Sequence, residues 1–408
     1  MGFKLALSAV ALALLLPFGY ERGQVLSSLF WKNAPHRLVK VNTFASHEVK
    51  FSDRIRSCED ALIVESEGLA ILGCDPGRER WNTVMGIFLP EPVESGGLYI
   101  YDYKDASASD DEALKQLKFI DFQLQSDFHS LGMAYDESTS TLFVASHRHD
   151  FPAVEMFKLD LKAYTATHLR SIQHPLIHGP NSIVLINDHE FYVTNNNHFL
   201  IRDYPILNKV ETNLGLPGGT IVHVDISPVL KDPEASVQAN VVRRLAFPNG
   251  IELLNDTTAV VASSAKAKVY FFSISRPAES ETGLPGVPKF TPASGLRLPF
   301  GPDNLSVSKD GALMIAGHPH IPSLGKFAKT RHVCNSPAEL AKTDAPMQET
   351  CRTFSAPSWA ARWTEDDGLE TLYADVEYPS SATAARDSDR KIGIISGLYA
   401  KGILVWRE

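Results

Sequence analysis

The sequence predicts an all-β fold, a six-bladed β-propeller preceded by a hydrophobic N-terminal leader helix. Short alternating or apolar runs bounded by Gly, Asp, Asn and Pro recur along the chain, whereas long helical periodicity is hard to find beyond the leader. One phrase is repeated: a polar residue or pair, an apolar strand, a polar turn and a second apolar strand. The copies lie roughly 50 to 75 residues apart, which suits a four-stranded blade with its loops.

The six copies of this phrase start near residues 59, 128, 180, 248, 303 and 380, and the last is the weakest. An array of β-sandwiches is the competing interpretation. In every copy the polar residues come just before the first apolar strand. In a propeller these residues would all converge on one end of the central channel, and this favours the ring.

The segments between and around the copies complete a single domain over residues 23–408. Residues 20–50 are expected to form a lead-in that helps close the ring, and residues 402–406 are expected to complete the last blade. Residues 321–362 carry two cysteines and several prolines. They are expected to form a long insertion loop, and loops of this length are usually functional or mobile.

Residues 1–22 are expected to be a signal peptide or a retained signal-anchor. After Lys4 comes an uncharged stretch, Leu5 to Phe18, of about 14 residues, which is shorter than the roughly 20 that cross a bilayer. A secretory signal is therefore favoured over a spanning helix. Since Leu16-Pro17-Phe18 is a poor cleavage site, an uncleaved leader held on a membrane or lipid surface is the second interpretation. Both place the protein in the secretory pathway, either secreted or anchored facing the lumen or exterior.

The charge balance excludes one class of partner. The chain has 39 Lys and Arg against 48 Asp and Glu, a formal charge of -9. It has no extended basic run that could neutralise phosphates, so nucleic-acid binding is excluded. A modest acidic excess is compatible with carboxylates gathered around a hard cation.

Four cysteines, an even number, favour disulfides in an oxidising compartment. Three connectivities are possible. A predicted hairpin places Cys58 opposite Cys74, and Cys334 and Cys351 bracket one polar loop, so local pairing is expected. The sequon at Asn255 falls in a predicted turn and suits N-glycosylation of a secreted protein.

The polar residues at the repeat starts form a set suited to calcium. Carboxylate and amide oxygens are hard donors, and Ca²⁺ takes six to eight of them. Asn and Asp ahead of strands are also common turn formers, which is the alternative reading of each one alone. The near-identical phrases in which they recur favour the metal site. The set consists of Glu59, Asp60, His129, Asn181, Asn249, Asp303 and Asn304.

Histidines provide candidates for proton transfer. His129 and His147 open and close the second copy, so one could act as a general base while the other orients it. His149 could replace or assist His147, and His318 is expected to line the channel. The sequence has no G-x-S-x-G elbow, P-loop or G-x-G-x-x-G. Hydrolysis would therefore need a metal to polarise the carbonyl and stabilise the oxyanion.

Taken together, these phrases resemble the serum paraoxonase and arylesterase family, calcium-dependent lactonases and esterases built on a six-bladed propeller. Each phrase alone is weak, but they occur in the family's order over about residues 57 to 320. They are Ser57-Cys58-Glu59-Asp60, Phe128-His129-Ser130-Leu131, Asn181-Ser182-Ile183-Val184, Phe191-Tyr192-Val193-Thr194-Asn195, Phe247-Pro248-Asn249-Gly250-Ile251, Asp303-Asn304-Leu305-Ser306-Val307 and Gly317-His318-Pro319.

The resemblance implies roles for particular residues. The family's catalytic calcium would be held by Glu59, Asn181, Asn249, Asp303 and Asn304. Its histidine dyad corresponds to His129 and His147, and its channel histidine to His318 as a substrate-binding residue.

The resemblance also implies a second, structural calcium, and here the sequence departs from the family. That ion would use Asp60, the carbonyl of Leu131 and an Asp at the position of Ser182. A neutral hydroxyl there removes one charge, which puts this site in doubt. The family's long-range disulfide to the C-terminus is excluded because the chain ends Trp406-Arg407-Glu408.

The resulting hypothesis is a calcium-dependent hydrolase of lactones and aryl esters with a small hydrophobic substrate. A metal-bound carboxylate, Glu59 or Asp303, could serve as the base instead of His129. One rival is a propeller enzyme of the gluconolactonase or strictosidine-synthase-like group. Another is a non-catalytic propeller that is stabilised by calcium and binds a protein or lipid partner.

Overall fold

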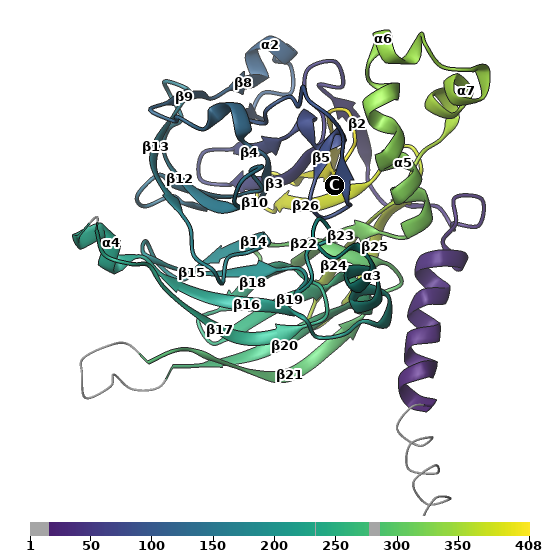
Figure 1. The fold of residues 1–408 in the computed structure, drawn as a ribbon. Coiled ribbons are helices and arrows are strands. Elements are labelled where there is room, and N and C mark those ends of the chain that lie inside the picture. Colours follow the sequence, from purple (N-terminus) through teal and green to yellow (C-terminus); the bar gives the residue numbers. More distant parts are fainter. Residues whose placement is uncertain (1–15, 233, 277–285) are drawn as a thin grey trace, which may run out of the picture.

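The computed structural model describes the whole chain except residues 1–15, 233 and 277–285, and it is mostly β (Figure 1). Apart from one two-stranded ribbon, β5 (Trp81–Asn82) with β6 (Ile87–Phe88), the described strands form six sheets of four or five strands. Neighbouring strands are antiparallel except where β9 joins β13 in parallel. Many strands are buried on both faces, because each sheet packs between two others.

Each sheet is built largely from consecutive strands. The first contains β3 (Cys58–Val64), β4 (Leu69–Cys74), β7 (Gly97–Asp102) and β8 (Leu114–Gln116). The second contains β10 (Ser130–Asp136), β11 (Thr141–Ser146), β12 (Ala153–Asp160), β13 (Thr165–Ile172) and β9 (Lys118–Ile120). The third contains β14 (Pro180–Leu185), β15 (Glu190–Asn195), β16 (Gly219–Asp225) and β17 (Gln238–Leu245).

The remaining three sheets follow the same plan. The fourth contains β18 (Pro248–Asn255), β19 (Thr258–Ser263), β20 (Lys268–Ser275) and β21 (Lys289–Arg297). The fifth contains β22 (Gly301–Val307), β23 (Leu313–His318), β24 (Ser358–Thr364), β25 (Gly368–Asp375) and β1 (Val41–Asn42). The sixth contains β26 (Ser381–Asp387), β27 (Ile392–Gly397), β28 (Ile403–Arg407) and β2 (Ser46–Lys50).

The six sheets follow one another around a ring. Their first strands contact each other in the order β3, β10, β14, β18, β22 and β26, and β26 returns to β3. An apolar cluster fills each space between neighbouring sheets, including the space between the sixth and the first. The arrangement is propeller-like, and each sheet depends on its neighbours to bury its faces.

The ring is closed by strands from both ends of the chain. β2 pairs with β28, so that His47 lies opposite Trp406, while β1 extends the fifth sheet beside β25. The expected lead-in and the expected last strand are therefore both confirmed. Since the sixth sheet needs both chain ends, the closing contacts are the most distant ones in the sequence.

All six innermost strands have a register shift close to their start. In each case two neighbouring backbone pairs of the first hairpin are separated by an irregularity, as between Pro180 and Ile183 or between Pro248 and Ile251. A β-bulge of this kind redirects side chains at a sheet edge. The polar residues singled out in the sequence lie at these shifts, except His129, which directly precedes β10. Gly250 permits close packing there, since a Cβ at this position would lie 2.6 Å from the backbone nitrogen of Leu305.

The segment 321–362 is not a loop, contrary to the sequence-based expectation. It contains α5 (Ile321–Cys334), α6 (Pro337–Leu340) and α7 (Ala345–Thr353), and its last residues belong to β24. Each helix has a proline in its first turn and a side-chain cap, from His320, Ser336 and Asp344 respectively. The prolines interrupt the apolar periodicity, which explains why the sequence pattern did not reveal the helices.

Several short elements complete the described structure. They are α2 (Asp110–Ala113), α3 (Pro205–Leu214), α4 (Ser227–Lys231), the 3₁₀ turns η2 (Pro76–Glu79), η3 (Gln125–Asp127) and η4 (Ser264–Lys266), and the π-helical turn η1 (Ser28–Lys32). Like α5, α6 and α7, the helix α3 was not anticipated by the sequence analysis.

A helix over residues 16–27 continues into η1 and stands beside the ring (Figure 1). Arg22 donates hydrogen bonds to the carbonyls of Thr212, Asn213 and Ala265, and Leu29 is buried. The expected boundary at residue 22 thus falls inside one continuous helix that packs on the ring. The leader's first 15 residues lie outside the described part. Among the described helices, none has the length and apolar character needed to cross a membrane.

Candidate active site

The bulges at the start of the innermost strands bring polar side chains from different sheets into one cavity. This cavity has a volume of about 370 Å³. Four of the five residues of the expected calcium set line it, together with His318 and Leu131. The fifth, Asn304, contacts the set directly. Each of the five is at most 5% exposed: Glu59, Asn181, Asn249, Asp303 and Asn304.

Hydrogen bonds connect these side chains into two groups. The amide nitrogen of Asn304 donates to Glu59 Oε1 at 3.0 Å. The amide nitrogen of Asn249 donates to Asp303 Oδ1, and the other oxygen of Asp303 lies 2.8 Å from His318 Nε2. The amide N–H groups of Asn249 and Asn304 are thus bound to neighbouring carboxylates, and these hydrogen bonds orient the amide oxygens.

Those remaining oxygens lack partners. Glu59 Oε2 and the side-chain oxygens of Asn181, Asn249 and Asn304 are buried without any hydrogen bond. A buried oxygen left unsatisfied costs about 1–3 kcal/mol. Four such oxygens in one set are what a hard cation would satisfy, so the residues fit a calcium ion.

The charge state of the set is shifted by the same burial. Burial raises the pKa of Glu59 well above its ordinary value, and the nearby carboxylates of Asp303 and Asp60 add to the effect. The carboxylates therefore repel one another in a dry environment. A cation among them would relieve that repulsion.

The residues of the expected second calcium do not show the same pattern. Asp60 accepts hydrogen bonds from the backbone of Ala61 and Met133 and from the hydroxyl of Thr383. Neither Asp60 nor Ser182 has an unpartnered buried side-chain oxygen. The oxygens of Asp60 and Ser182 therefore do not fit a calcium ion as the oxygens of the first set do. Thr383, at the bulge of the sixth sheet, also accepts from Asn304, and the weak sixth phrase of the sequence concealed it.

His129 belongs to a chain of alternating carboxylates and imidazoles. Its Nδ1 lies 3.2 Å from both oxygens of Asp75, and its Nε2 lies 3.5 Å from Asp127 Oδ1. His149 Nδ1 lies 2.5 Å from the same Asp127 oxygen and its Nε2 is 3.4 Å from Glu91. Ligand atoms of Asp127, His129 and His149 all lie within 4.8 Å of one another, so this cluster could also hold a metal ion.

The environment of His129 favours its charged form. Burial opposes the charge, but the carboxylates of Asp75 and Asp127 outweigh it and raise the pKa of His129 to about 9. Asp75 and Asp127 are positioned by the turns η2 and η3 and belong to no sequence motif. The sequence analysis therefore missed both.

His147 has a different setting from the one expected for a partner of His129. Its Nε2 lies 2.6 Å from the carbonyl of Pro180, and Nδ1 contacts the hydroxyl of Thr83. Burial lowers its pKa to about 4. Among the described residues that line the cavity, His318 is present but His129 and His147 are not. The ring that faces His129 is that of His149, with centroids 5.5 Å apart.

The cysteines form the two local disulfides expected from the sequence. Cys58 joins Cys74 across the first hairpin, directly beside Glu59, and Cys334 joins Cys351 between α5 and α7. Asn255 lies exposed in the turn between β18 and β19, where a sequon would be accessible.

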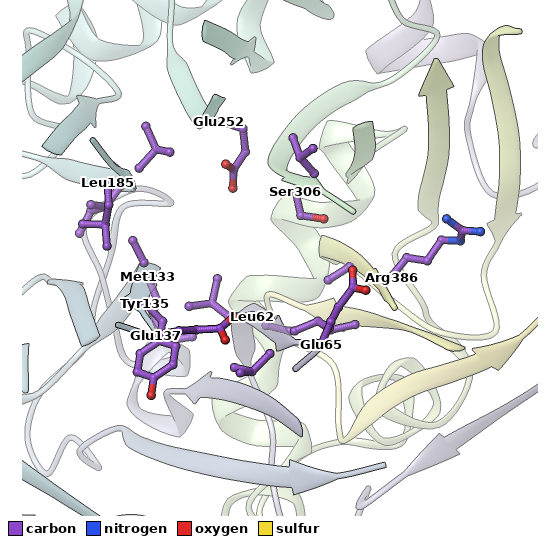
Figure 2. A pocket seen from close by; sticks show the side chains of 17 residues that line it. Leu62, Glu65, Met133, Tyr135, Glu137, Leu185, Glu252, Ser306 and Arg386 are labelled. Carbon is purple, nitrogen blue, oxygen red and sulfur yellow. The ribbon is translucent and has the colours of Figure 1, made fainter. Parts of the chain in front are cut away.

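A second cavity, of about 280 Å³, lies at the other end of the innermost strands (Figure 2). Glu252 points into it, with Glu65, Glu137 and Arg386 around its margin (Figure 2). Burial, and to a smaller extent Asp60, raises the pKa of Glu252 to about 8. None of the residues expected at the calcium site lines this cavity.

Comparison with curated proteins finds distant relatives over part of the chain. Over 152 residues, 29% are identical to serum paraoxonase/arylesterase 2 of Rattus norvegicus, covering 36% of this chain and 41% of that protein. Over 195 residues, 28% are identical to human serum paraoxonase/arylesterase 1, covering 47% of this chain and 49% of that protein. The matches thus span less than half the length of these two curated relatives.

Solved structures also align with this chain at low identity. A luciferin-regenerating enzyme aligns with a TM-score of 0.47 and 10% identity, covering 89% of this chain and 95% of that one. A gluconolactonase of Xanthomonas campestris aligns with a TM-score of 0.45 and 12% identity, covering 90% and 94%. The family profile described as Arylesterase matches residues 83–341, more than half of the sequence. The chain therefore belongs to the arylesterase family.

Proposed function

We propose that this protein is a calcium-dependent hydrolase of lactones and aryl esters, and that its ring of sheets is a six-bladed β-propeller. The observation that carries the proposal is the set of four unpartnered buried oxygens on Glu59, Asn181, Asn249 and Asn304. Family membership and the serum paraoxonase/arylesterase relatives support the reaction class.

Calcium would be held by these four residues together with Asp303. A cation bound there polarises a substrate carbonyl and carries negative charge as it develops on the oxygen. The side-chain oxygens of Asp60 and Ser182 are not among the unpartnered buried atoms. We therefore propose one calcium ion rather than two.

We propose that the neutral form of His129, whose fraction rises as the pH approaches its pKa of about 9, accepts the proton of the attacking water. Its Nε2 is buried and has no hydrogen-bond partner, while Asp75 orients the ring through Nδ1. The water oxygen bonds to the carbonyl carbon, the acyl C–O bond breaks, and the proton taken up by His129 passes to the leaving oxygen. Asp127 would stabilise the charged ring, and His149, which contacts the same carboxylate oxygen, would hold Asp127 in place.

A carboxylate is the second candidate for the base. Asp303 lines the cavity and is paired with His318, whereas His129 lies behind the described lining. The two roles separate in a comparison of variants. Replacing His129 by Gln should lower turnover by about 100-fold with calcium affinity intact if it is the base, and His318→Gln should then have the smaller effect. Unchanged turnover in His129→Gln would exclude His129 as the base and leave the two carboxylates, Asp303 and Glu59.

The cavity also supports a hydrophobic substrate. Its apolar lining comes from η1, the turn between β5 and β6, and α5 as well as from residues in or next to strands of the ring. These residues are Leu29, Phe30, Val84, Met85, Leu131, Phe247, Ile321, Leu324 and Leu398. Activated esters and lactones are expected rather than amides, since calcium acidifies a bound water less than zinc does.

The first experiment is hydrolysis of phenyl acetate and of an aliphatic δ-lactone by the full chain, with calcium and after EDTA. Activity should disappear on chelation, return with calcium and be absent in Asn249→Ala. Asn213→Ala is the matched control, because Asn213 lines the same cavity but its amide donates to the carbonyl of Lys209. No hydrolysis under any condition, with calcium still raising the melting temperature, would instead indicate a calcium-stabilised binding propeller.

We also propose that the protein enters the secretory pathway, is glycosylated at Asn255 and retains its leader for attachment to a membrane or lipid surface. The two disulfides support an oxidising compartment. Retention is supported by Arg22, whose guanidinium is fixed by three carbonyls of the ring. Mass spectrometry of the N-terminus and of the glycopeptide tests both proposals.

A further inference from the structure

Arg78 is a buried cation without a matching anion. Its side chain is 2% exposed, lines the cavity of the candidate active site, and donates one hydrogen bond, to the carbonyl of Ser130. Its Nε is buried without a partner. Among the described residues, no carboxylate oxygen lies within ion-pair distance of Arg78. Burying a charge in this way is costly unless an opposite charge or several hydrogen bonds compensate.

In Arg22, the other arginine that lines the cavity, hydrogen bonds compensate the burial of the charge. Arg22 donates to three backbone carbonyls, which satisfy both terminal nitrogens and Nε. Arg78 has one such carbonyl and keeps a free N–H at Nε. Of the two arginines, Arg78 is therefore the one with an unused N–H group.

The charges of the described lining residues also favour an anionic ligand. Arg22, Arg78 and Lys209 contribute three cationic side chains against the two carboxylates of Glu59 and Asp303. The calcium ion proposed above would increase the positive excess further. A cavity with this balance attracts an anionic ligand more strongly than a neutral one.

The position of Arg78 is also fixed before any ligand binds. It lies on η2, directly after Gly77, where a Cβ would come within 3.0 Å of the His129 ring. The next residue, Glu79, bonds to Arg56 at 3.0 Å and to Asn335 at 2.7 Å. Preorganisation of this kind lowers the entropy cost of binding at a charged group.

We propose that Arg78 binds a carboxylate on the substrate, so that the preferred substrates are esters or lactones with an apolar body and a separate carboxylate group. This inference rests on the proposed function and names its substrate class. A guanidinium with free N–H groups binds a carboxylate through charge-assisted hydrogen bonds. The apolar lining around Met85 and Leu324 accommodates the body of the same molecule.

The test compares two aryl acetates that differ by one carboxylate, phenyl acetate and 4-acetoxybenzoate. For each protein the ratio of kcat/KM for the charged substrate to kcat/KM for the neutral one is measured, which cancels general losses. Arg78→Met should lower this ratio by about 10- to 100-fold, mainly through KM of the charged substrate, because hydrogen bonds to charged groups have this strength. Arg78→Lys should retain part of the preference. Lys209→Met also removes one positive charge from the cavity lining and should lower the ratio much less than Arg78→Met does.

Inhibition of the unmodified protein provides a readout that needs no variant. Benzoate should inhibit phenyl acetate hydrolysis competitively and at lower concentration than benzamide, which has the same ring without the charge. An equal loss of both activities in Arg78→Met, with benzoate and benzamide equivalent, overturns the proposal and gives Arg78 a structural or oxyanion role.

Binding separates this proposal from the hydrolase proposal. Benzoate should raise the melting temperature of the calcium-loaded protein, and Arg78→Met should abolish that rise even if no substrate is hydrolysed. Absence of hydrolysis together with Arg78-dependent benzoate binding contradicts the enzyme assignment but supports the anion site. Hydrolysis without any selective effect of benzoate supports the enzyme assignment and contradicts the anion site.

Discussion

At the scale of single residues, the site is defined by polar atoms that the protein itself leaves unsatisfied. Asn304 and Asn249 use their amide nitrogens on neighbouring carboxylates, which leaves their oxygens free. Asp60, one residue from Glu59, is by contrast saturated by three donors. The same residue types at adjacent positions thus have different capacities for a cation, because their hydrogen-bond partners differ.

A residue-scale prediction concerns His129 and pH. Since the folded-state pKa is about 9 against an ordinary 6.5, the histidine stabilises the fold fully below pH 6.5, and this contribution is lost as the pH rises through about 9. The contribution is on the order of 3 kcal/mol. Urea unfolding of the unmodified protein and of Asp75→Asn between pH 6 and 9.5 should show a smaller decline in the variant.

The control for this prediction is His189→Gln, in an exposed turn beside Asp188. Its pH dependence should match that of the unmodified protein. An identical decline in Asp75→Asn would show that the carboxylate does not hold the proton on His129.

At the scale of elements, hairpins and disulfides position the site. The Cys58–Cys74 disulfide links β3 to β4 immediately before Glu59, whereas the Cys334–Cys351 disulfide links α5 to α7. The two disulfides have nearly equal sequence separations, 16 and 17 residues. Their entropic effect on the unfolded chain should therefore be similar.

The element-scale prediction uses this match. Replacing either cysteine pair by alanines should lower the free energy of unfolding by about 2–4 kcal/mol. Only the Cys58/Cys74 double variant should also bind calcium more weakly, because only that disulfide constrains a residue of the proposed ligand set. Calorimetric titration of both double variants with calcium tests the difference, and equal calcium affinities would contradict it.

At the scale of the whole molecule, stability depends on closing the ring. β28 lies between β27 and β2, so the C-terminal strand holds the N-terminal one. Trp406 on β28 is 1% exposed and stacks on Phe44, with ring centroids 4.8 Å apart. A Cβ on Gly393 would lie 2.0 Å from the Trp406 ring, so this close packing requires glycine.

The corresponding prediction is a loss of about 3–5 kcal/mol in Trp406→Ala, since truncating a buried Trp leaves a cavity. Trp31→Ala, at a side chain that is 64% exposed, should change stability by less than about 0.5 kcal/mol. Equilibrium unfolding in urea measures both. A small loss in Trp406→Ala would show that the last sheet is held mainly by its backbone pairing.

The sequence by itself determined the features that repeat or are local. The six phrases and their spacing predicted the strands, their cyclic arrangement and the polar residues at one end of the channel, because a repeated unit leaves a repeated pattern. Both disulfide pairs were predicted from the short sequence separation of their cysteines, although α5 and α7, not a loop, bring Cys334 and Cys351 together. The cyclic arrangement of the six sheets explains why Glu59 and Asn304, 245 residues apart, could be placed at one site without knowing any contact.

Only the tertiary structure decided the features without a repeating pattern. Asp75, Arg78 and Asp127 lie on short turns, so nothing in their sequence positions indicates that they converge with His129 and Glu59. The partner facing His129 is His149 rather than His147, a difference of two positions set by side-chain direction. The helices of 321–353 begin with prolines that favoured the loop interpretation in the sequence, although proline is well tolerated in a first turn. Packing between distant segments fixed the other two features.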